Sequence, residues 1–404
     1  MAESDLAIET SGDCIPGMQS QTAALSSVAL VHDWLTGMRG GEKVLDALCR
    51  MFPDAPLWTL LYNQGTVSER IAKRVIHQSF LQHCPFAKNK YRSYLPLFPL
   101  FAETNKAHAT IVISTSHAVA KSMVRRGKSE KQLHICYLHT PMRYAWDLFD
   151  EYFGASRVGI VASKFIYKPI IRMLQLYDIW TLDRVDLFVA NSSYVAERVK
   201  RIYGRDAAVL PPPVDISRFA GTERKPEDWY LIVSALVPYK RVEHGIEACA
   251  KLGRKLKIIG SGPEMKKLRR IAEEMKAEVD FLGFVPDDIL TDYYCRAKAL
   301  LFPGIEDFGI VPVESIAAGC PVLAYAKGGI LDSMNERTAV FYTEQSARGL
   351  MGAMKDFEIR HGEFSASELR RHAQSFSEES FLLRFERILH QAIASRRLSR
   401  AVLD

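Results

Sequence analysis

The feature that most constrains the fold is a regular alternation of short apolar runs with helical patterns in the second half of the chain. The apolar runs predict strands at residues 230–236, 255–260, 279–284, 299–303, 321–325 and 338–343. The helical patterns fall between and after them, at residues 242–252, 263–276, 287–297, 312–318 and 346–357. Strands that alternate with helices are typical of a parallel sheet with helices on both faces. We therefore expect a doubly wound α/β domain here.

The first half of the chain repeats this alternation less regularly. A buried strand is expected at 26–32, followed by the glycine-rich turn DWLTGMRGGE and a helix at 42–51. Later elements are expected as strands at 109–115, 133–139 and 186–192 and as a helix at 193–203. Two α/β domains of this kind leave a cleft between them, where a substrate pocket is the default expectation.

The boundary between the two domains is marked by three successive prolines in VLPPPVDISRF (209–219), which break any helix. The polar stretch GTERKPED follows them. We assign residues 1–26 to a flexible N-terminal tail, 27–222 to a first domain and 223–376 to a second domain. A helix within 377–404 is expected to pack back on the first domain.

Length and composition suit a soluble globular protein of two domains. The chain has 404 residues, of which 48% are hydrophobic and 25% are charged. No run approaches the roughly 20 apolar residues that span a bilayer, and the polar N-terminus lacks the apolar core of a signal peptide. The seven cysteines are scattered without a C-x-x-C pair, so neither a disulfide framework nor a zinc site is expected. These features favour a reducing cytoplasm.

Positive charge is concentrated between residues 65 and 145. This segment contains thirteen Lys or Arg and three Glu, a balance of +10 against +6 for the whole chain. Nucleic acid, anionic lipid or an acidic substrate would each explain such a patch, and so would ordinary solvated helix faces. The stretches at 88–101 and 163–180 interleave apolar residues with Lys and Arg. They predict either helices that pack on the sheet or a surface that rests on an anionic membrane, and we favour the membrane.

Residues that can bind a ligand gather in LFPGIEDFGIVPVESIAAGCPVL (301–323), where Glu306 and Glu314 stand eight positions apart. The first acid lies in a loop after a predicted strand and the second in the first turns of a helix, which is where α/β folds bind ligands. Carboxylates there can accept sugar or ribose hydroxyls, and the helix N-terminus can bind phosphate. Taken alone, the two acids could simply cap a helix and face solvent. The flanking strands and the Phe-Gly turn favour a functional role.

Three further strand-to-helix turns converge on the same edge of the predicted sheet. The turn SALVPYKR offers Lys240 and Arg241, whose charges can reach a diphosphate. The turn GSGPE contains Gly260 and Gly262, where a ligand can approach the backbone closely or where the turn itself needs glycine. The segment FLGFV ends a third strand.

These motifs occur together in an order and spacing that resemble a known family. VSALVPYKR, IIGSGPE, FLGFV and FPGIEDFGIVPVESIAAGCPVLAYAKGG resemble the donor-binding half of the family 4 retaining glycosyltransferases, which have the GT-B fold. In the first half, VHDWLTGMRGGEKVL and YLHTPMRYAWD resemble the mannosyltransferase-like branch of that family. The resemblance covers about residues 28–390 and implies two Rossmann-like domains that face each other across a cleft. The first would lie on the acceptor side and the second would bind the donor.

The resemblance identifies Glu306 and Glu314 with the family's E-x7-E hallmark. It implies that Glu314 binds the ribose hydroxyls of the nucleotide and that Glu306 lies by the hydroxyls of the donor sugar. The backbone N–H groups of Gly309 and Ile310, beside Phe308 in the turn, would cradle the diphosphate.

The resemblance also gives roles to residues outside this hallmark. Lys240 is the motif lysine, and the segment that holds Phe284 and Val285 would border the nucleobase. Gly40 and Gly41 would let the loop of the first domain approach the donor, and His139 would lie near the donor sugar. Arg241, Gly260 and Gly262 remain donor-site candidates from their turns.

One position departs from the family pattern. The family usually shows an Arg five residues before the motif lysine, and this chain has Ala235 there. Either one phosphate contact is missing, or Arg241 or Arg39 supplies the charge. Asp33 and Arg143 are weaker candidates for the site, and each would serve equally well as a structural ion-pair partner.

The predicted activity is that of a retaining hexosyltransferase of polysaccharide biosynthesis that uses a nucleotide-diphosphate sugar. GDP-mannose is the first expectation for the donor, and the acceptor is expected to be a glycan or a lipid-linked intermediate. No cofactor and no metal are expected, because Lys240 and helix N–H groups can stabilise the leaving phosphate. We expect a cytoplasmic location, peripheral on the inner face of the membrane, and no nucleic-acid partner.

Two alternatives come from other classes of protein. A dinucleotide-dependent oxidoreductase also has two α/β domains, but it needs G-x-G-x-x-G after its first strand, where this chain has GMRGGE after a longer gap. A nucleic-acid-binding protein would use the basic segment 65–145, but no RNA-binding signature or aromatic stacking platform supports it. A P-loop enzyme is disfavoured because G-x-x-x-x-G-K-[ST] is absent.

Overall fold

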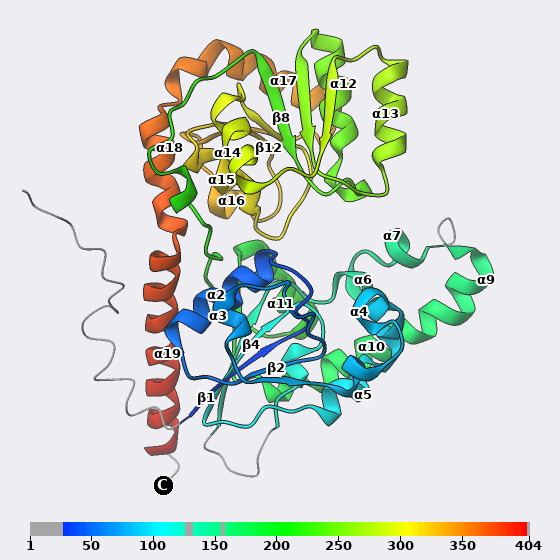
Figure 1. Cartoon of the computed structure of the whole chain (residues 1–404), viewed down its shortest axis with the longest axis vertical. Coiled ribbons are helices and arrows are strands. Elements are labelled where there is room, and N and C mark those ends of the chain that lie inside the picture. The colour runs from blue at the N-terminus through cyan, green and yellow to red at the C-terminus, as the bar shows by residue number, and fades with distance from the viewer. Residues whose placement is uncertain (1–26, 126–131, 155–157, 402–404) are drawn as a thin grey trace, which may run out of the picture.

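The structure is a computed structural model, and it describes residues 27–125, 132–154 and 158–401. Two β-sheets, each covered by helices, form two domains that lie one above the other in Figure 1. The strand pairs in both sheets are parallel, so the predicted α/β class with two doubly wound domains is confirmed. Residues 1–26, which the sequence analysis assigns to a tail, lie outside the described residues.

The first domain is built on a seven-stranded sheet in the order β3-β2-β1-β4-β5-β6-β7. Side chains alternate between its two faces: Ala29 and Val31 enter one apolar cluster and Leu30 enters the other. The strands are β1 (Val28–His32), β2 (Leu57–Thr59), β3 (Ile76–Gln78), β4 (Ile111–Ser116), β5 (Leu133–Leu138), β6 (Leu187–Ala190) and β7 (Ala207–Val209). The sequence pattern does not predict β2, β3 and β7, which have three residues each; β3 and β7 contain no buried residue, so no apolar run marks them.

Helices cover both faces of this sheet. They are α2 (Gly40–Met51), α3 (Glu69–Ala72), η1 (Phe80–His83), α4 (Ala87–Lys90), η2 (Tyr91–Leu97), α5 (Phe98–Thr104), η3 (Ala120–Ser122), α6 (Arg143–Trp146), α7 (Phe149–Phe153), η5 (Leu182–Arg184) and α11 (Ser193–Tyr203). α2 begins at Gly40, two residues before its predicted start. The Glu42 carboxylate accepts a hydrogen bond from the Arg39 N–H at 3.1 Å and so fixes this first turn.

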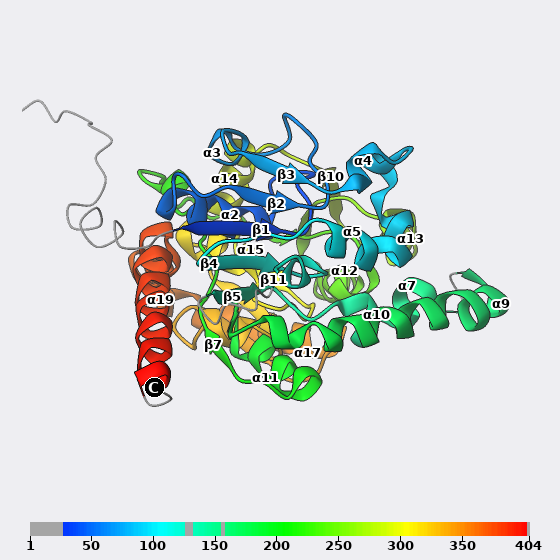
Figure 2. The ribbon, with the colours of Figure 1, turned by 90° about the horizontal axis from the view of Figure 1, so that it is seen from below.

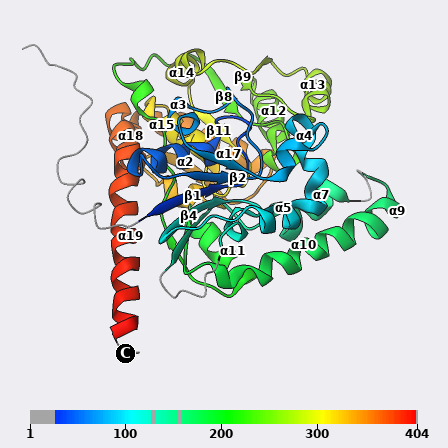
Figure 3. The same cartoon turned by 60° about the horizontal axis from the view of Figure 1, so that its bottom comes forward.

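A helical arm, residues 160–180, extends from the side of the first domain (Figure 2, Figure 3). It consists of α9 (Ile160–Ala162), η4 (Ser163–Tyr167) and α10 (Lys168–Trp180). Its inner side packs Ile171 and Leu174 into the core, but much of its apolar surface is uncovered. Large apolar side chains that are at least 40% exposed on the arm are Ile160, Val161, Phe165, Ile166, Met173, Leu176, Ile179 and Trp180.

The second domain is built on a six-stranded sheet in the order β10-β9-β8-β11-β12-β13. Its strands are β8 (Trp229–Val233), β9 (Lys255–Ile259), β10 (Val279–Gly283), β11 (Leu300–Phe302), β12 (Val322–Tyr325) and β13 (Ala339–Tyr342). Its helices are η7 (Pro238–Lys240), α12 (Val242–Leu252), α13 (Met265–Glu274), α14 (Asp287–Arg296), α15 (Ile310–Ala317), α16 (Ile330–Ser333), α17 (Ala347–Arg360), η8 (His361–Glu363) and α18 (Ala366–Ala373). Every strand and helix predicted for this half is present, with boundaries that differ by a few residues.

The chain crosses between the domains twice, and the two crossings touch. It enters the second domain through η6 (Ser217–Phe219) and leaves it after η9 (Gln374–Phe376). The Val214 N–H of the first crossing donates a hydrogen bond to the Phe376 carbonyl of the second at 2.8 Å. The last helix, α19 (Glu378–Ala401), then runs down the first domain, where Phe381 and Phe385 are buried in its core (Figure 1).

Two further expectations can be compared with the described residues. Among them, no helix combines the length and the apolar character needed to cross a bilayer. Most of the described cysteines are small core residues, as expected. The buried ones are Cys49, Cys136, Cys249, Cys295 and Cys320.

Candidate active site

A cavity of about 630 Å³ lies between the domains, at the carboxyl ends of both sheets. In each sheet the strand order reverses at this point, between β1 and β4 and between β8 and β11, which is where open α/β sheets bind ligands. The cavity is lined by Trp34, Arg39, Gly40, Gly41, Glu42, Arg92, Leu95, Phe98, His117, His139, Thr140, Arg143, Tyr144, Tyr152, Phe153, Asn191, Pro212, Glu306, Asp307, Phe308, Gly309, Ile310 and Val311.

Glu306 lies in the loop after β11 and forms an ion pair with Lys240, at the end of η7. The two loops can meet because Gly304 has no side chain: a β-carbon there would lie 2.9 Å from the Lys240 Cα. Both side chains are mostly buried, so the paired charges are only partly screened by solvent. The structure thus brings together the predicted motif lysine and the first acid of the predicted hallmark.

Glu314, on α15, is 6% exposed and receives positive charge from two sides. The Arg218 Nη2 lies 2.9 Å from its Oε1, and the Lys43 Nζ lies 3.7 Å from the same oxygen. The Tyr294 hydroxyl donates a hydrogen bond to its other oxygen at 3.2 Å. Arg218, Lys43 and Tyr294 were not predicted from the sequence. The only signals were that Arg218 follows the triple proline and that Lys43 lies in the first turn of the predicted helix at 42–51.

The start of α15 faces the start of α2 across the cavity. Gly309 has φ 93° and turns the chain so that α15 begins at Ile310, two residues before its predicted start at Pro312. A β-carbon at Gly40 would lie 2.8 Å from the Ile310 Cδ1, and one at Gly41 would lie 3.4 Å from the His139 Nε2. The two glycines therefore let α2 approach both the second domain and the histidine, while the first N–H groups of α15 have no partner within the helix.

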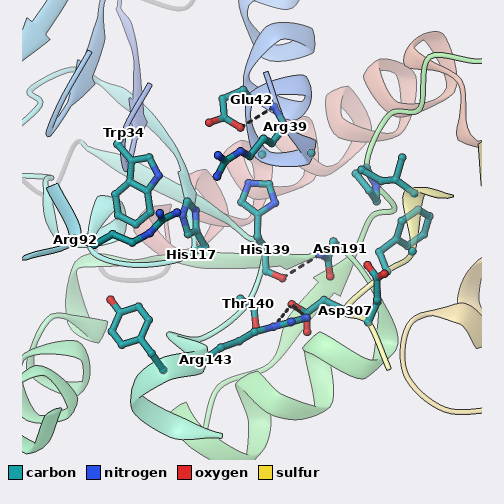
Figure 4. Close-up of a pocket in the computed structure, with 18 of the residues that line it drawn as sticks. Trp34, Arg39, Glu42, Arg92, His117, His139, Thr140, Arg143, Asn191 and Asp307 are labelled. Atoms are coloured by element: carbon teal, nitrogen blue, oxygen red, sulfur yellow. Dashed lines mark hydrogen bonds and ion pairs between the residues drawn. The ribbon is translucent and has the colours of Figure 1, made fainter. Parts of the chain in front are cut away.

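His139 follows β5 and lines the cavity through its ring (Figure 4). Its carbonyl accepts a hydrogen bond from the Asn191 Nδ2 at 3.0 Å, while its buried Nε2 makes no hydrogen bond within the described residues. Burial, together with the nearby rings of His117 and His32, holds the pKa of His139 well below its ordinary value of 6.5. The ring is therefore neutral at neutral pH and offers an unused polar atom to a ligand.

His117 also lines the cavity and was not singled out from the sequence. Burial lowers its pKa, although the Asp33 carboxylate, 3.2 Å from its Nδ1, acts in the opposite direction. Asp33 itself is fully buried and accepts hydrogen bonds from the backbone N–H groups of residues 117–120 at 2.7 to 3.0 Å. Its carboxylate holds the turn after β4 in place, which accounts for it as a structural residue.

Asp307 joins the two domains. Its carboxylate accepts a hydrogen bond from the Arg143 Nε at 2.9 Å and pairs with the Arg198 Nη1 at 3.0 Å, both from the first domain. Arg198 also donates to Thr140 and pairs with Asp147. Arg143, a weaker candidate for the site, is thus an ion-pair partner at the cavity wall (Figure 4). Asp307 was part of a quoted motif, but nothing in the sequence indicated its partners.

Several predicted site residues are not among those that line the cavity: Asp33, Lys240, Arg241, Gly260, Gly262, Phe284, Val285 and Glu314. Arg241 has φ 52° at the start of α12, and its guanidinium lies 3.6 Å from Glu243. Phe284 is 85% exposed, and Val285 packs against the core of the second domain. Arg39, in contrast, lines the cavity beside Glu42 (Figure 4). Of the two candidates to compensate for Ala235, Arg39 is the better positioned.

Gly260 and Gly262 serve contacts between loops. A β-carbon at Gly260 would clash with the carbonyl of Ser234, and one at Gly262 would clash with that of Leu236. The Leu236 N–H donates to the Ser261 carbonyl at 3.0 Å, so the turns after β8 and β9 lie against each other. Phe308 lines the cavity but is itself buried, with its ring 5.7 Å from that of Phe376.

Comparison with known proteins decides the family. The family model for Glycosyltransferase Family 4 matches residues 38–218, and the model for Glycosyl transferases group 1 matches residues 214–367. The chain belongs to the family 4, group 1 glycosyltransferases. The predicted family and its GT-B fold are confirmed. This membership favours the transferase prediction over an oxidoreductase or a nucleic-acid-binding protein.

Curated relatives of this glycosyltransferase family member support the mannosyltransferase-like branch. The GDP-mannose-dependent alpha-(1-6)-phosphatidylinositol monomannoside mannosyltransferase of Mycobacterium tuberculosis is 30% identical over 175 residues, which are 36% of this chain and 46% of that protein. The D-inositol 3-phosphate glycosyltransferase of Geodermatophilus obscurus is 28% identical over 225 residues, 48% and 50% of the two chains. The chain spans about half or less of the length of the curated relatives it matches.

Solved structures share the whole GT-B architecture. The structure of Anabaena HepE in complex with UDP-glucose superposes with a TM-score of 0.64 at 17% identity, over 90% of this chain and 99% of that one. At this identity the likeness concerns the fold. Among the described residues, no group of three or more His, Cys, Asp or Glu is arranged to hold a metal ion, and the absence of a metal requirement stays a prediction.

Proposed function

We propose that this protein is a retaining glycosyltransferase that moves a hexose from a nucleotide-diphosphate sugar to a glycan or lipid-linked acceptor. The observation that carries the proposal is one cavity lined by Glu306, the start of α15, Gly41 and His139, whose Nε2 makes no hydrogen bond within the described residues. Lys240 forms an ion pair with the lining Glu306. A cation and helix N–H groups suit a diphosphate, and a carboxylate and a neutral imidazole suit sugar hydroxyls.

The reaction exchanges one bond at the anomeric carbon for another on the same face of the sugar. The bond from that carbon to the diphosphate oxygen breaks, a bond to the acceptor oxygen forms, and the acceptor proton passes to the departing phosphate. Lys240 and the N–H groups of α15 stabilise the negative charge that grows on the phosphate. Glu306 and His139 hold the sugar, and closure of the domains keeps water away from it. With these groups in place we propose that no metal is required, so a chelator should leave the rate unchanged.

We propose GDP-mannose as the donor, because relatives in the mannosyltransferase-like branch are named as GDP-mannose-dependent enzymes. A solved structure of the same fold was determined with UDP-glucose, so UDP is the competing nucleotide. Melting temperatures measured with GDP, UDP and ADP at equal concentration test the choice, because a ligand that binds the native state raises its melting temperature. GDP should give the largest increase. A larger increase with UDP would overturn the GDP assignment, and no increase with any nucleotide would overturn the transferase proposal.

We propose that the enzyme works in the cytoplasm, on the surface of an anionic membrane, through the arm (residues 160–180). The exposed apolar residues of the arm are interleaved with the exposed basic residues Lys164, Lys168 and Arg172, a combination that suits anionic lipid. Flotation with vesicles provides the test. The protein should float with vesicles that contain phosphatidylglycerol at low salt, and equal flotation with pure phosphatidylcholine would contradict the proposal.

A further inference from the structure

His117 occupies a position in the cavity to which the proposed function gives no role. It follows β4, its ring lines the cavity, and its side chain is 31% exposed. The ring lies between those of Trp34 and His139 (Figure 4), with its centroid 4.5 Å from that of Trp34 and 6.2 Å from that of His139. Because the proposed function assigns His139 to the donor sugar, His117 lies one ring farther into the first domain, where an acceptor would bind.

A buried carboxylate determines which nitrogen of this ring carries the hydrogen. The Asp33 Oδ2 lies 3.2 Å from the Nδ1 of His117, and Asp33 is fully buried. Both oxygens of Asp33 also accept hydrogen bonds from the backbone N–H groups of residues 117–120, so the carboxylate is fixed in place. A lone pair on Nδ1 would face this acceptor and be repelled, so the neutral ring keeps its hydrogen on Nδ1. The Nε2 then carries a lone pair that can accept a hydrogen bond.

This lone pair is available to a ligand. Within the described residues the Nε2 of His117 makes no hydrogen bond, and part of the ring is open to the cavity. Burial lowers the pKa of His117 below its ordinary value of 6.5, so the ring is neutral at neutral pH. The charged and titratable groups around the ring are Asp33, His32, Glu42, Arg92 and His139. A neutral imidazole with a free lone pair suits a hydroxyl group as its ligand.

We propose that His117 binds a hydroxyl of the acceptor through Nε2 and so orients the acceptor toward the anomeric carbon of the donor sugar. This inference rests on the proposed function and adds an acceptor-binding residue to the same cavity. In the proposed reaction the attacking hydroxyl gives its proton to the departing phosphate, so the hydroxyl on His117 is a neighbouring one on the same acceptor. Holding the acceptor in one orientation lowers the barrier to transfer. Asp33 acts only through His117, as a positioning residue.

The predicted tautomer can be observed without any ligand. NMR chemical shifts of the ring nitrogens in the full-length protein distinguish a protonated from an unprotonated nitrogen, and the signals that disappear in His117→Gln identify this ring. At neutral pH we expect His117 to be protonated at Nδ1 and unprotonated at Nε2. The opposite tautomer would overturn the inference, because Nε2 would then have no lone pair to offer.

Calorimetric titration of the full-length protein in the presence of GDP tests the binding of hydroxyls. The probes are octyl mannoside, octyl glucoside and myo-inositol, all of which carry adjacent ring hydroxyls. At least one should bind, and His117→Ala should weaken its binding about three- to tenfold, the usual effect of losing one uncharged hydrogen bond. His117→Gln, whose amide oxygen can replace Nε2, should restore part of the affinity. His108→Gln, at an exposed histidine of the same domain, is the matched control.

The outcomes separate this inference from the proposed function. Every variant should bind GDP as the wild type does. If none of the three probes binds while GDP does, or if His117→Ala leaves their affinity unchanged, the inference is overturned and the proposed function stands.

The pH dependence of probe binding separates a direct contact from a structural role. Protonation puts a hydrogen on Nε2, so the affinity of the wild type should be complete above about pH 6.5 and should fall as the pH drops below it. His117→Gln has no titrating group at this position, so its affinity should fall less steeply, although His32, His139 and Glu42 remain. An identical dependence on pH in the two proteins would overturn the inference.

Discussion

The two domains line the cavity with different chemistry. On the second-domain side the lining carboxylates are already paired, Glu306 with Lys240 and Asp307 with Arg143. The first-domain side is aromatic and histidine-rich, with Arg92 as a cation that no described carboxylate neutralises. Burying a charge without a partner costs free energy, so these ion pairs stabilise the charged groups of the cavity in the ligand-free protein. Under the proposed function, donor binding would exchange ionic partners, whereas acceptor binding would cover apolar surface.

The largest effect on the rate is expected from removing Lys240, the cation that pairs with Glu306. Lys240→Gln should lower kcat by about 100- to 1000-fold, because the charge on the leaving phosphate loses its main side-chain partner in the transition state. Initial rates at saturating donor measure this. Lys251→Gln, on the exposed end of α12, is the control and should leave kcat unchanged. A variant that lost GDP affinity but kept kcat would show that Lys240 holds the ground state only.

Substitutions at the two hallmark acids, Glu314 and Glu306, should have different effects on GDP binding and on kcat. Glu314→Ala should weaken GDP binding by about tenfold or more, because Arg218 loses one of its two ion-pair partners and the ribose would lose its predicted acceptor. Glu306→Ala should mainly reduce kcat, since its carboxylate is proposed to hold the donor sugar. Titration with GDP and steady-state rates on the same preparations separate these effects. Equal changes in both quantities for both variants would contradict the division of roles.

The last prediction concerns the stability of the first domain in acid, which depends on its buried histidines. Burial lowers the pKa of His134 to about 4 and the pKa of His139 well below 6.5, so the folded protein binds fewer protons than the unfolded chain. Their contribution to stability is complete above about pH 6.5 and is lost as the pH falls toward 4. For His134 alone this is on the order of 3 kcal/mol.

A series of melting temperatures across this range measures the loss. His134→Gln should flatten the dependence on pH, although it also removes hydrogen bonds to Ser114 and the Arg184 carbonyl. His361→Gln, at an exposed histidine of the second domain, should leave the slope unchanged. If His134→Gln left the dependence of melting temperature on pH unchanged, the loss of stability in acid would come from other groups.

The second domain could be predicted from the sequence almost element by element, because buried apolar strands and amphipathic helices leave strong local patterns. Its hallmark acids and Lys240 also came from local motifs, and the structure brings Lys240 and Glu306 together. The first domain was harder to predict, since a strand such as β3 is largely exposed and no apolar run marks it. The arm retains exposed apolar residues, so its pattern alone could not separate a packed helix from a membrane surface.

The unpredicted parts of the site are pairings between distant segments. Asp307 meets Arg143 and Arg198 from the other domain, across more than a hundred residues of sequence. Arg218 reaches Glu314 from the connection between the domains. A single sequence contains no signal for such contacts, because the spacing within each segment is unaffected by its distant partner. Arg241 shows the converse: its position in a motif predicted a phosphate contact, but its backbone conformation turns it toward Glu243.

The two crossings between the domains also determine which part of the molecule is displaced most when the domains move relative to each other. The hydrogen bond from Val214 to Phe376 joins the two connecting segments, so both crossings lie along one edge of the molecule. α19 continues along this edge, whereas α4, α9 and α10 lie on the opposite side (Figure 1). A rotation of one domain relative to the other about this edge displaces most the side of the molecule that is farthest from the edge. A small change in the angle between the domains therefore produces a larger displacement on the side of the cleft next to the arm.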